Sequence, residues 1–174
     1  QVMAEAAAGH TPPSSRMRLI PGIKETLIID DSYNASPVAT LAALDSLSLV
    51  MTAKRKIAVL GDMMELGRYS VESHKKVGVR AAQVTDLLVT VGFRAQGIAE
   101  AALDAGFPDS QILQFEDSRK AGKELEALIQ PGDCILIKGA QSMRMERAVE
   151  ELMMNPEDAE KLLVRQEEEW KRKM

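Results

Sequence analysis

The sequence predicts an α/β domain built on a mostly parallel β-sheet with helices on both faces. Short apolar runs recur along the chain, and they are continuous rather than alternating, which is typical of strands that are covered on both sides. Segments with helical spacing separate these runs, as expected when right-handed crossovers join parallel strands. At 174 residues the chain has the length of one domain.

The first two predicted strands form a hairpin. They cover residues 16–20 and 26–31, and we expect a turn at Pro21-Gly22 because Pro followed by Gly suits the centre of a type II turn. Residues 10–15 (HTPPSS) form a predicted linker, since the two prolines fix φ and offer no backbone donors. Residues 1–8 resemble the tail of a helix.

Four further apolar runs predict the central strands. Each run is bounded by charged residues, Gly or Pro. They are residues 56–60 (KIAVL), 87–91 (LLVTV), 112–115 (ILQF) and 134–137 (CILI). In sheets of this kind ligands bind beyond the carboxyl ends of the strands, so the residues that follow each run are the candidates for a site.

Helices are predicted between the strands of the first half of the chain. Ser36 is an N-cap followed by Pro37 at the first helical position. Ser70 caps a second helix, and an Ala-rich third helix, residues 95–105, ends at Gly106. The positions expected to face inward are Leu41, Leu44, Leu47, Met51, Val71, His74, Val77 and Ala81.

The second half of the chain holds three further predicted helices. Asp117 or Ser118 opens one, Ser142 opens the next, and a highly charged last helix runs from Asn155 to the C-terminus. A narrow stripe on that last helix predicts weak packing; it consists of Leu162, Leu163, Gln166 and Trp170. The inward positions of the other two helices are Ala121, Leu125, Leu128, Met145, Val149 and Leu152.

Composition argues against several classes of protein. Twenty-two Lys and Arg against 26 Asp and Glu give a net charge of −4, which lacks the basic footprint of a nucleic-acid binder. No apolar run reaches the ~18 residues of a membrane-spanning helix. With one cysteine and no signal-peptide pattern, we expect a cytoplasmic, reducing environment. The first residue is Gln rather than Met, as expected of a fragment or a processed product.

Polar residues gather where the strand at 26–31 meets the next helix. Asp31, Tyr33 and Asn34 precede the helix that begins after Ser36, and the N-terminus of a helix favours anions. This arrangement predicts a polar pocket for an anionic ligand. An equally open interpretation is that Asp31 and Asn34 only shape the turn and cap the helix.

Further candidates follow the other strands. Asp62 and Glu65, after the strand at 56–60, could contact a cation or an amine, or simply form a solvated loop. Lys138, after the strand at 134–137, suits a phosphate or carboxylate. A lysine at a strand end can equally extend its amine into solvent. Arg144 lies where the helix dipole disfavours a cation unless an acid or an anion partners it.

Several ligand motifs are missing from the sequence. There is no GxGxxG and no GxxxxGK[ST], so the sequence has no glycine cradle for a triphosphate. No His and Cys cluster has metal spacing, so no metal site is predicted. His74 falls on an apolar helix face, where a core histidine is commoner than a catalytic one, and Cys134 reads as a small buried hydrophobe.

Six runs of residues, taken in order, resemble the C-terminal domain of the Mur ligases. They are SSRMRLI, IIDDSYNASP, KIAVLGDMMELG, SVESHKKVG, LLVTVG and ILIKGAQSMRMERAVEEL. GDMMELG and MRMER favour the members that add D-Ala-D-Ala. The resemblance implies a Rossmann-like, three-layer ligase domain over residues 12–154. It also implies that residues 1–11 are the end of a preceding ATPase domain with its linker, and that residues 155–174 are an added helical extension.

The resemblance implies an ATP-dependent ligase of peptidoglycan precursors. In this family the carboxylate of a UDP-N-acetylmuramoyl-tripeptide is phosphorylated, and the amine of D-Ala-D-Ala attacks the acyl phosphate. The implied partners are these substrates and the N-terminal and central domains, which would hold most contacts to Mg²⁺; no nucleic acid and no membrane span are expected. This chain would close over ATP, help bind the dipeptide, and be inactive alone.

The resemblance also assigns site residues. Arg16 matches the arginine that reaches the ATP phosphates, and with Lys138 it is implied to act in catalysis. The nucleotide-side residues are Arg16, Asp31, Tyr33 and Asn34. Those placed near the dipeptide are Gly92, Phe93, Lys138, Gly139, Ser142 and Arg144. The family matches without an assigned contact are Asp62, Glu65 and His74.

The sequence departs from the family pattern at two places. Ser36 replaces the usual Asn, and Ala140-Gln141 replaces the usual Ser-Arg, which removes one candidate basic side chain. Two alternatives stay open: another Mur or folylpolyglutamate synthase-like ligase, and a stand-alone, non-catalytic Rossmann-like binding module. A screen of amine acceptors would distinguish the D-Ala-D-Ala ligase from the other ligases. An upstream P-loop in the same reading frame would favour a ligase over the binding module.

Overall fold

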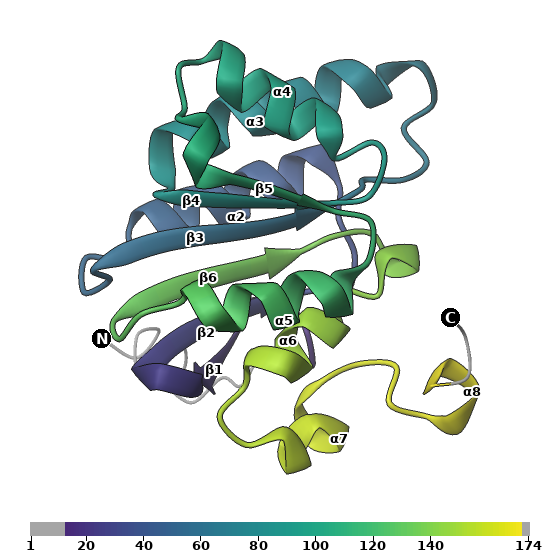
Figure 1. The fold of residues 1–174 in the computed structure, drawn as a ribbon. Helices are drawn as coiled ribbons and strands as arrows, with labels where there is room; N and C mark the ends of the chain where they lie inside the picture. Colours follow the sequence, from purple (N-terminus) through teal and green to yellow (C-terminus); the bar gives the residue numbers. More distant parts are fainter. Residues whose placement is uncertain (1–12, 172–174) are drawn as a thin grey trace, which may run out of the picture.

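A six-stranded sheet forms the middle layer of the computed structural model, which describes residues 13–171 (Figure 1). The strand order is β1-β2-β6-β3-β4-β5, and only β1 runs antiparallel to its neighbour within this sheet. The predicted mostly parallel α/β fold is therefore confirmed. The strands are β1 (Arg18–Gly22), β2 (Thr26–Asp31), β3 (Arg55–Gly61), β4 (Leu87–Val91), β5 (Ile112–Phe115) and β6 (Asp133–Lys138).

Helices cover both faces of the sheet, with α5 and α6 on one side and α2, α3 and α4 on the other (Figure 1). In β3, Ile57 and Val59 join the core under α5 and α6, whereas Ala58 and Leu60 join the opposite core. Because both faces are buried, the strands read as continuous apolar runs. The helices are α2 (Pro37–Ser48), α3 (Ser70–Val84), α4 (Gln96–Asp104), α5 (Ser118–Leu128) and α6 (Glu146–Leu152).

The first hairpin turns later than predicted. Pro21 and Gly22 lie inside β1, where they pair with residues of β2, and the chain reverses through the 3₁₀ turn η1 (Ile23–Glu25). The predicted turn at Pro21-Gly22 is therefore wrong. Proline is tolerated in β1 because this is an edge strand. Its carbonyl accepts a hydrogen bond from the backbone N–H of Met154 at 2.9 Å.

Two helices begin differently from the prediction. Ser142 does not open α6, because the 3₁₀ turn η4 (Gln141–Met143) and the left-handed residue Arg144 (φ 53°) come first. Ser70 is the first residue of α3 rather than its cap, since the 3₁₀ turn η2 (Gly67–Tyr69) leads directly into the helix. A further short turn, η3 (Asp109–Gln111), precedes β5.

Most of the predicted inward positions are buried, but three are exposed. Met51 lies beyond the end of α2 and is 87% exposed, because the helix stops at Ser48. Val71 and Leu128 lie on the outer faces of the first turn of α3 and the last turn of α5. All three lie at or beyond a helix end, so helical spacing alone overestimates burial there.

The C-terminal segment is not the single helix that its composition predicts. It holds the short elements η5 (Pro156–Asp158), α7 (Ala159–Leu162) and α8 (Glu168–Lys171), separated by a stretch of other backbone. Leu163 belongs to the core under α6, and Arg165 is buried in a left-handed conformation. The expectation of weak packing is wrong for Leu163, and Arg165 is not among the residues predicted to pack.

Two expectations concern the chain ends and the membrane. The helix tail predicted at residues 1–8 and the domain end predicted at residues 1–11 lie outside the described residues. Within residues 13–171, no helix is both long enough and apolar enough to cross a membrane.

Candidate functional site

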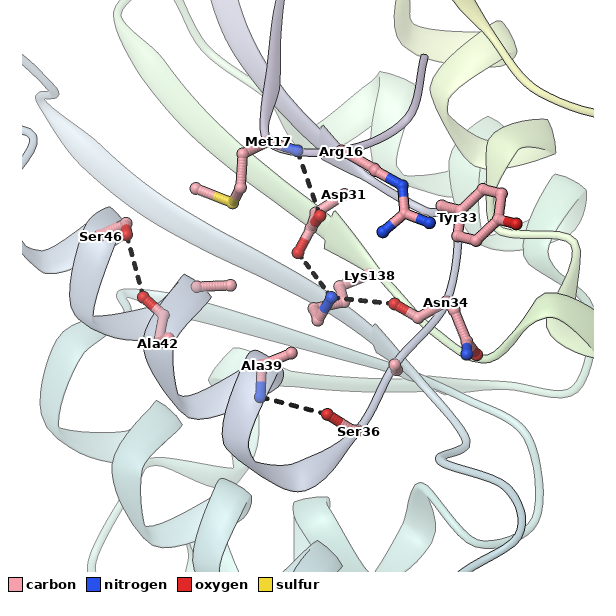
Figure 2. A pocket seen from close by; sticks show the side chains of 12 residues that line it. Arg16, Met17, Asp31, Tyr33, Asn34, Ser36, Ala39, Ala42, Ser46 and Lys138 are labelled. Atoms are coloured by element: carbon pink, nitrogen blue, oxygen red, sulfur yellow. Dashed lines mark hydrogen bonds and ion pairs between the residues drawn. The ribbon is translucent and has the colours of Figure 1, made fainter. Parts of the chain in front are cut away.

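The carboxyl ends of β2 and β6 bring together an acidic and a basic side chain. The strands are parallel neighbours, and Asp31 lies opposite Lys138 in their register. The Lys138 Nζ atom donates to Asp31 Oδ2 at 2.5 Å and to the Asn34 carbonyl at 2.9 Å (Figure 2). Lys138 is only 3% exposed, so the interpretation that its amine extends into solvent is wrong.

Asp31 also ties the entry segment of the domain to this cluster. Its Oδ1 atom accepts a hydrogen bond from the backbone N–H of Met17 at 3.1 Å. Neither Asp31 nor Asn34 caps α2, because the N-cap is Ser36, whose hydroxyl accepts from the backbone N–H of Ala39. The interpretation of Asp31 and Asn34 as cap residues is therefore wrong, and the predicted cap at Ser36 is confirmed.

The cluster opens onto a cavity of about 430 Å³, which we call the first cavity. Arg16 and Tyr33 lie side by side in the wall of this cavity, with the guanidinium carbon of Arg16 4.0 Å from the centroid of the Tyr33 ring (Figure 2). Small side chains of α2 leave the space open. Its lining residues are Arg16, Met17, Asp31, Tyr33, Asn34, Ala35, Ser36, Ala39, Ala42, Ala43, Ser46 and Lys138.

The charges around the first cavity favour an anionic ligand. Arg16 and Lys138 bring two cations to a wall that carries one carboxylate, Asp31. Asp30 lies behind this wall, fully buried, and burial is the main cause that raises its pKa. Its Oδ1 atom accepts from the N–H of Ser32 at 3.1 Å, whereas Oδ2 has no hydrogen-bond partner among the described residues.

A second cavity of about 520 Å³ adjoins the first, because Asn34 and Ala35 line both. Glu65 contributes to it from the loop after β3 and has a left-handed backbone, φ 61°. Two of the residues predicted for the site, Glu65 and Ser142, therefore meet here. The second cavity is lined by Asn34, Ala35, Met64, Glu65, Ala140, Gln141, Ser142 and Trp170.

Six of the predicted site residues line neither of these two cavities, and three of them surround the ends of β3 and β4. Asp62 is buried, and its Oδ1 atom accepts from the backbone N–H of Ala95 at 2.7 Å, which fixes the start of α4. A Cβ atom on Gly92 would lie 2.6 Å from that same oxygen. Phe93 is 80% exposed on the following loop. These positions shape the edge of the sheet rather than the cavity walls.

His74 and Gly139 have structural contacts that account for them. Nδ1 of His74 donates to the Ser70 carbonyl at 2.7 Å, and Nε2 accepts from the N–H of Met63 at 3.1 Å, so both ring nitrogens are used inside the core. This is the core histidine that the sequence favours. A Cβ atom on Gly139 would lie 2.6 Å from Cγ of Met145, so the backbone there must stay bare.

Arg144 belongs to a buried charge cluster that the sequence did not reveal. Its Nε atom donates to Oε1 of Glu146 at 2.5 Å, and Arg165 donates to the other carboxylate oxygen at 2.9 Å. Arg165 also donates to the carbonyls of Ser32 and Tyr33, the loop beside the first cavity. The dipole argument correctly requires an acidic partner for Arg144, but no local pattern points to Arg165.

Metal ligands do not gather in this part of the chain. Within residues 13–171, no group of three or more His, Cys, Asp or Glu side chains could hold a metal ion. The one carboxylate of the first cavity, Asp31, is already bound by Lys138 and Met17.

Comparison with known proteins adds an independent observation. The model of the family described as Mur ligase, glutamate ligase domain, matches residues 15–141. The UDP-N-acetylmuramoyl-tripeptide--D-alanyl-D-alanine ligase of Bacillus subtilis is 30% identical over 154 residues, which are 88% of this chain and 34% of that protein. This chain thus spans about a third of that relative's length.

Two solved structures share the fold. The MurF ligase from Thermotoga maritima in complex with ADP superposes with a TM-score of 0.68 and 28% identity, covering 92% of this chain and 36% of that chain. A MurF structure from Acinetobacter baumannii gives a TM-score of 0.73 and 29% identity, covering 87% of this chain and 33% of that chain.

Proposed function

Because the chain belongs to the Mur ligase, glutamate ligase domain family, we propose that it acts as a domain of an ATP-dependent ligase that joins D-Ala-D-Ala to UDP-N-acetylmuramoyl-tripeptide. The observation that carries the proposal is the Asp31–Lys138–Asn34 cluster where β2 and β6 end. Relatives of known structure support it, since one holds ADP and bears the MurF name.

In this proposal the first cavity receives the nucleotide. Arg16 and Lys138 line this cavity and would face the phosphoryl group, since preorganised cations stabilise the negative charge that gathers there during transfer. Asp31 holds the Lys138 amine in place, and Tyr33 and Asn34 complete the wall. Mg²⁺ is assigned mainly to the N-terminal and central domains, as the family resemblance implies.

The second cavity receives the dipeptide in this proposal. Its position beside the first cavity would set the attacking amine near the activated carboxylate, and oriented reactants gain several kcal/mol, roughly 7–11 in well-aligned systems. Ser142 lines this cavity, whereas Gly139, Gly92, Phe93 and Arg144 would act indirectly through the loops they support. Closure against the N-terminal and central domains would exclude water from a hydrolysable acyl phosphate.

We assign residues 12–154 to the ligase domain, residues 155–174 to a C-terminal extension, and residues 1–11 to the end of a preceding ATPase domain. The chain alone is then expected to fold without catalysing. It offers one wall of a site formed between domains, so ATP should bind on the order of millimolar.

Nucleotide binding by the chain itself tests the first cavity. In an ATP titration followed by NMR, the backbone amide signals of residues around Lys138 and Asp31 should shift. Lys138→Ala should weaken ATP binding about tenfold. Lys123→Ala, at an exposed position of α5, is the matched control and should leave binding unchanged. Micromolar affinity or phosphate release by the chain alone would contradict the assignment of an incomplete site.

A chimera tests the reaction. We would replace the matching third of the Bacillus subtilis relative with this chain and screen amine acceptors in the presence of ATP, Mg²⁺ and the UDP-sugar tripeptide. We expect D-Ala-D-Ala to be added, and Asp31→Ala to raise KM for ATP and lower kcat. Addition of a different amine would favour another Mur or folylpolyglutamate synthase-like ligase. A folded chimera that ligates no amine would favour the stand-alone binding module.

A further inference from the structure

The C-terminal segment brings an aromatic side chain to the second cavity. Trp170, the only tryptophan in the sequence, lines this cavity together with Asn34, Glu65 and Ser142. These partners lie between 28 and 136 residues earlier in the chain, since they follow β2, β3 and β6. The cavity therefore depends on a segment that lies outside the sheet and its covering helices.

Buried charges hold this segment in place. The Arg144 Nη1 atom donates to the Trp170 carbonyl at 2.8 Å, and its guanidinium carbon lies 5.4 Å from the indole ring centroid. Arg165, five residues earlier, lies 5.9 Å from the same ring and shares the buried Glu146 carboxylate with Arg144. Because less than a tenth of Arg144, Glu146 and Arg165 is exposed, Trp170 sits on a fixed support.

The lining of the second cavity matches a small zwitterionic peptide. Glu65 can pair with an ammonium group, and Gln141 and Ser142 offer hydrogen-bond donors for a carboxylate or an amide. Apart from Asn34, the remaining wall is apolar: it consists of two alanines, a methionine and the indole of Trp170, which is its largest member. Such a wall suits short aliphatic side chains.

We propose that Trp170 is a specificity-determining residue of the second cavity: its indole packs against the side chain of the incoming dipeptide and limits the size of that side chain. The proposal rests on the proposed function for the identity of the dipeptide. Arg144, Glu146 and Arg165 act as positioning residues, because they fix the indole without lining the cavity.

Fluorescence of the wild-type chain tests contact directly, because no other tryptophan contributes. Titration with D-Ala-D-Ala should give a saturable change in Trp170 emission in the millimolar range. Glu65→Gln should weaken this response about tenfold, since it removes the charge that pairs with the ammonium group. Glu72→Gln, at an exposed position of α3, is the matched control. A wild-type emission that stays constant up to tens of millimolar D-Ala-D-Ala would overturn the proposal.

Acceptor preference in the chimera tests specificity. Trp170→Ala should raise KM for D-Ala-D-Ala about tenfold and lower KM for the larger acceptor D-Ala-D-Leu. Trp170→Phe should restore most of the wild-type preference for D-Ala-D-Ala. Thermal melting of each variant checks the fold. If the chimera ligates D-Ala-D-Ala and Trp170→Ala leaves both KM values unchanged, the inference fails and the proposed function stands. If the wild-type chimera ligates no D-Ala-D-Ala, the proposed function itself fails.

Discussion

Replacing Glu146 with Ala should strongly destabilise the fold. The Glu146 carboxylate is 1% exposed and binds two guanidinium groups, Arg144 at 2.5 Å and Arg165 at 2.9 Å. Both arginines are less than a tenth exposed, so the variant leaves two buried cations without their shared anion. Breaking a buried pair from one side costs about 3–5 kcal/mol, and we expect a loss of that order in the free energy of unfolding.

Urea titrations followed by circular dichroism measure this loss, and a melting curve should show a fall in Tm on the order of 10 °C. Glu72→Gln is the control, because Glu72 pairs with Lys76 on the solvent face of α3 and its removal should leave the midpoint unchanged. Glu146→Gln keeps the shape of the side chain and part of its hydrogen bonding, so its loss of unfolding free energy should lie between those of Glu146→Ala and the control. A loss below about 1 kcal/mol for Glu146→Ala would mean that solvent reaches the cluster, and the burial argument would be refuted.

Three further predictions follow from buried groups. Burial raises the pKa of Asp30 above its ordinary value of 3.8, so the free energy of unfolding should fall as the pH rises from 3.8 through the raised pKa. In urea titrations at several pH values, Asp30→Asn should make the free energy of unfolding less dependent on pH. Gly78→Ala should cost about 1–3 kcal/mol, because its Cβ would lie 2.2 Å from the Ile98 carbonyl oxygen, whereas Gly97→Ala should not destabilise. Burial raises the pKa of Cys134 to about 11, so a thiol reagent at pH 8 should label it only after unfolding.

The central sheet and the meeting of Asp31 and Lys138 at its carboxyl edge were predictable because local patterns carry them. Strands buried on both faces need continuous apolar runs, and β3, β4, β5 and β6 all lie within one residue of the predicted limits. The strand-end rule then brings Asp31 and Lys138 to the same edge, and they pair there. Once β2 and β6 are neighbours, the register of the two strands places these side chains opposite each other.

Errors concentrate where two local signals compete. Pro21-Gly22 has the chemistry of a turn, yet an edge strand also accepts proline, and pairing with β2 extends β1 through both residues. Ser142 has the chemistry of a helix cap, but a 3₁₀ turn precedes α6 and places this residue beside the second cavity instead. In both cases the residue type alone does not decide, because pairing with β2 or the local 3₁₀ turn competes with the expected role.

The C-terminal segment shows how a tertiary contact overrides local preference. Its charged, aromatic-poor sequence has good helix formers, but a short solvent-exposed helix gains little, so competing contacts decide its path. Arg165 takes a left-handed backbone, φ 58°, which interrupts any helix and lets its guanidinium reach Glu146 and the carbonyls of Ser32 and Tyr33. The same residue therefore supports the loop of the first cavity and the tryptophan of the second. Loosening it should affect both cavities together, which no sequence pattern within either cavity could indicate.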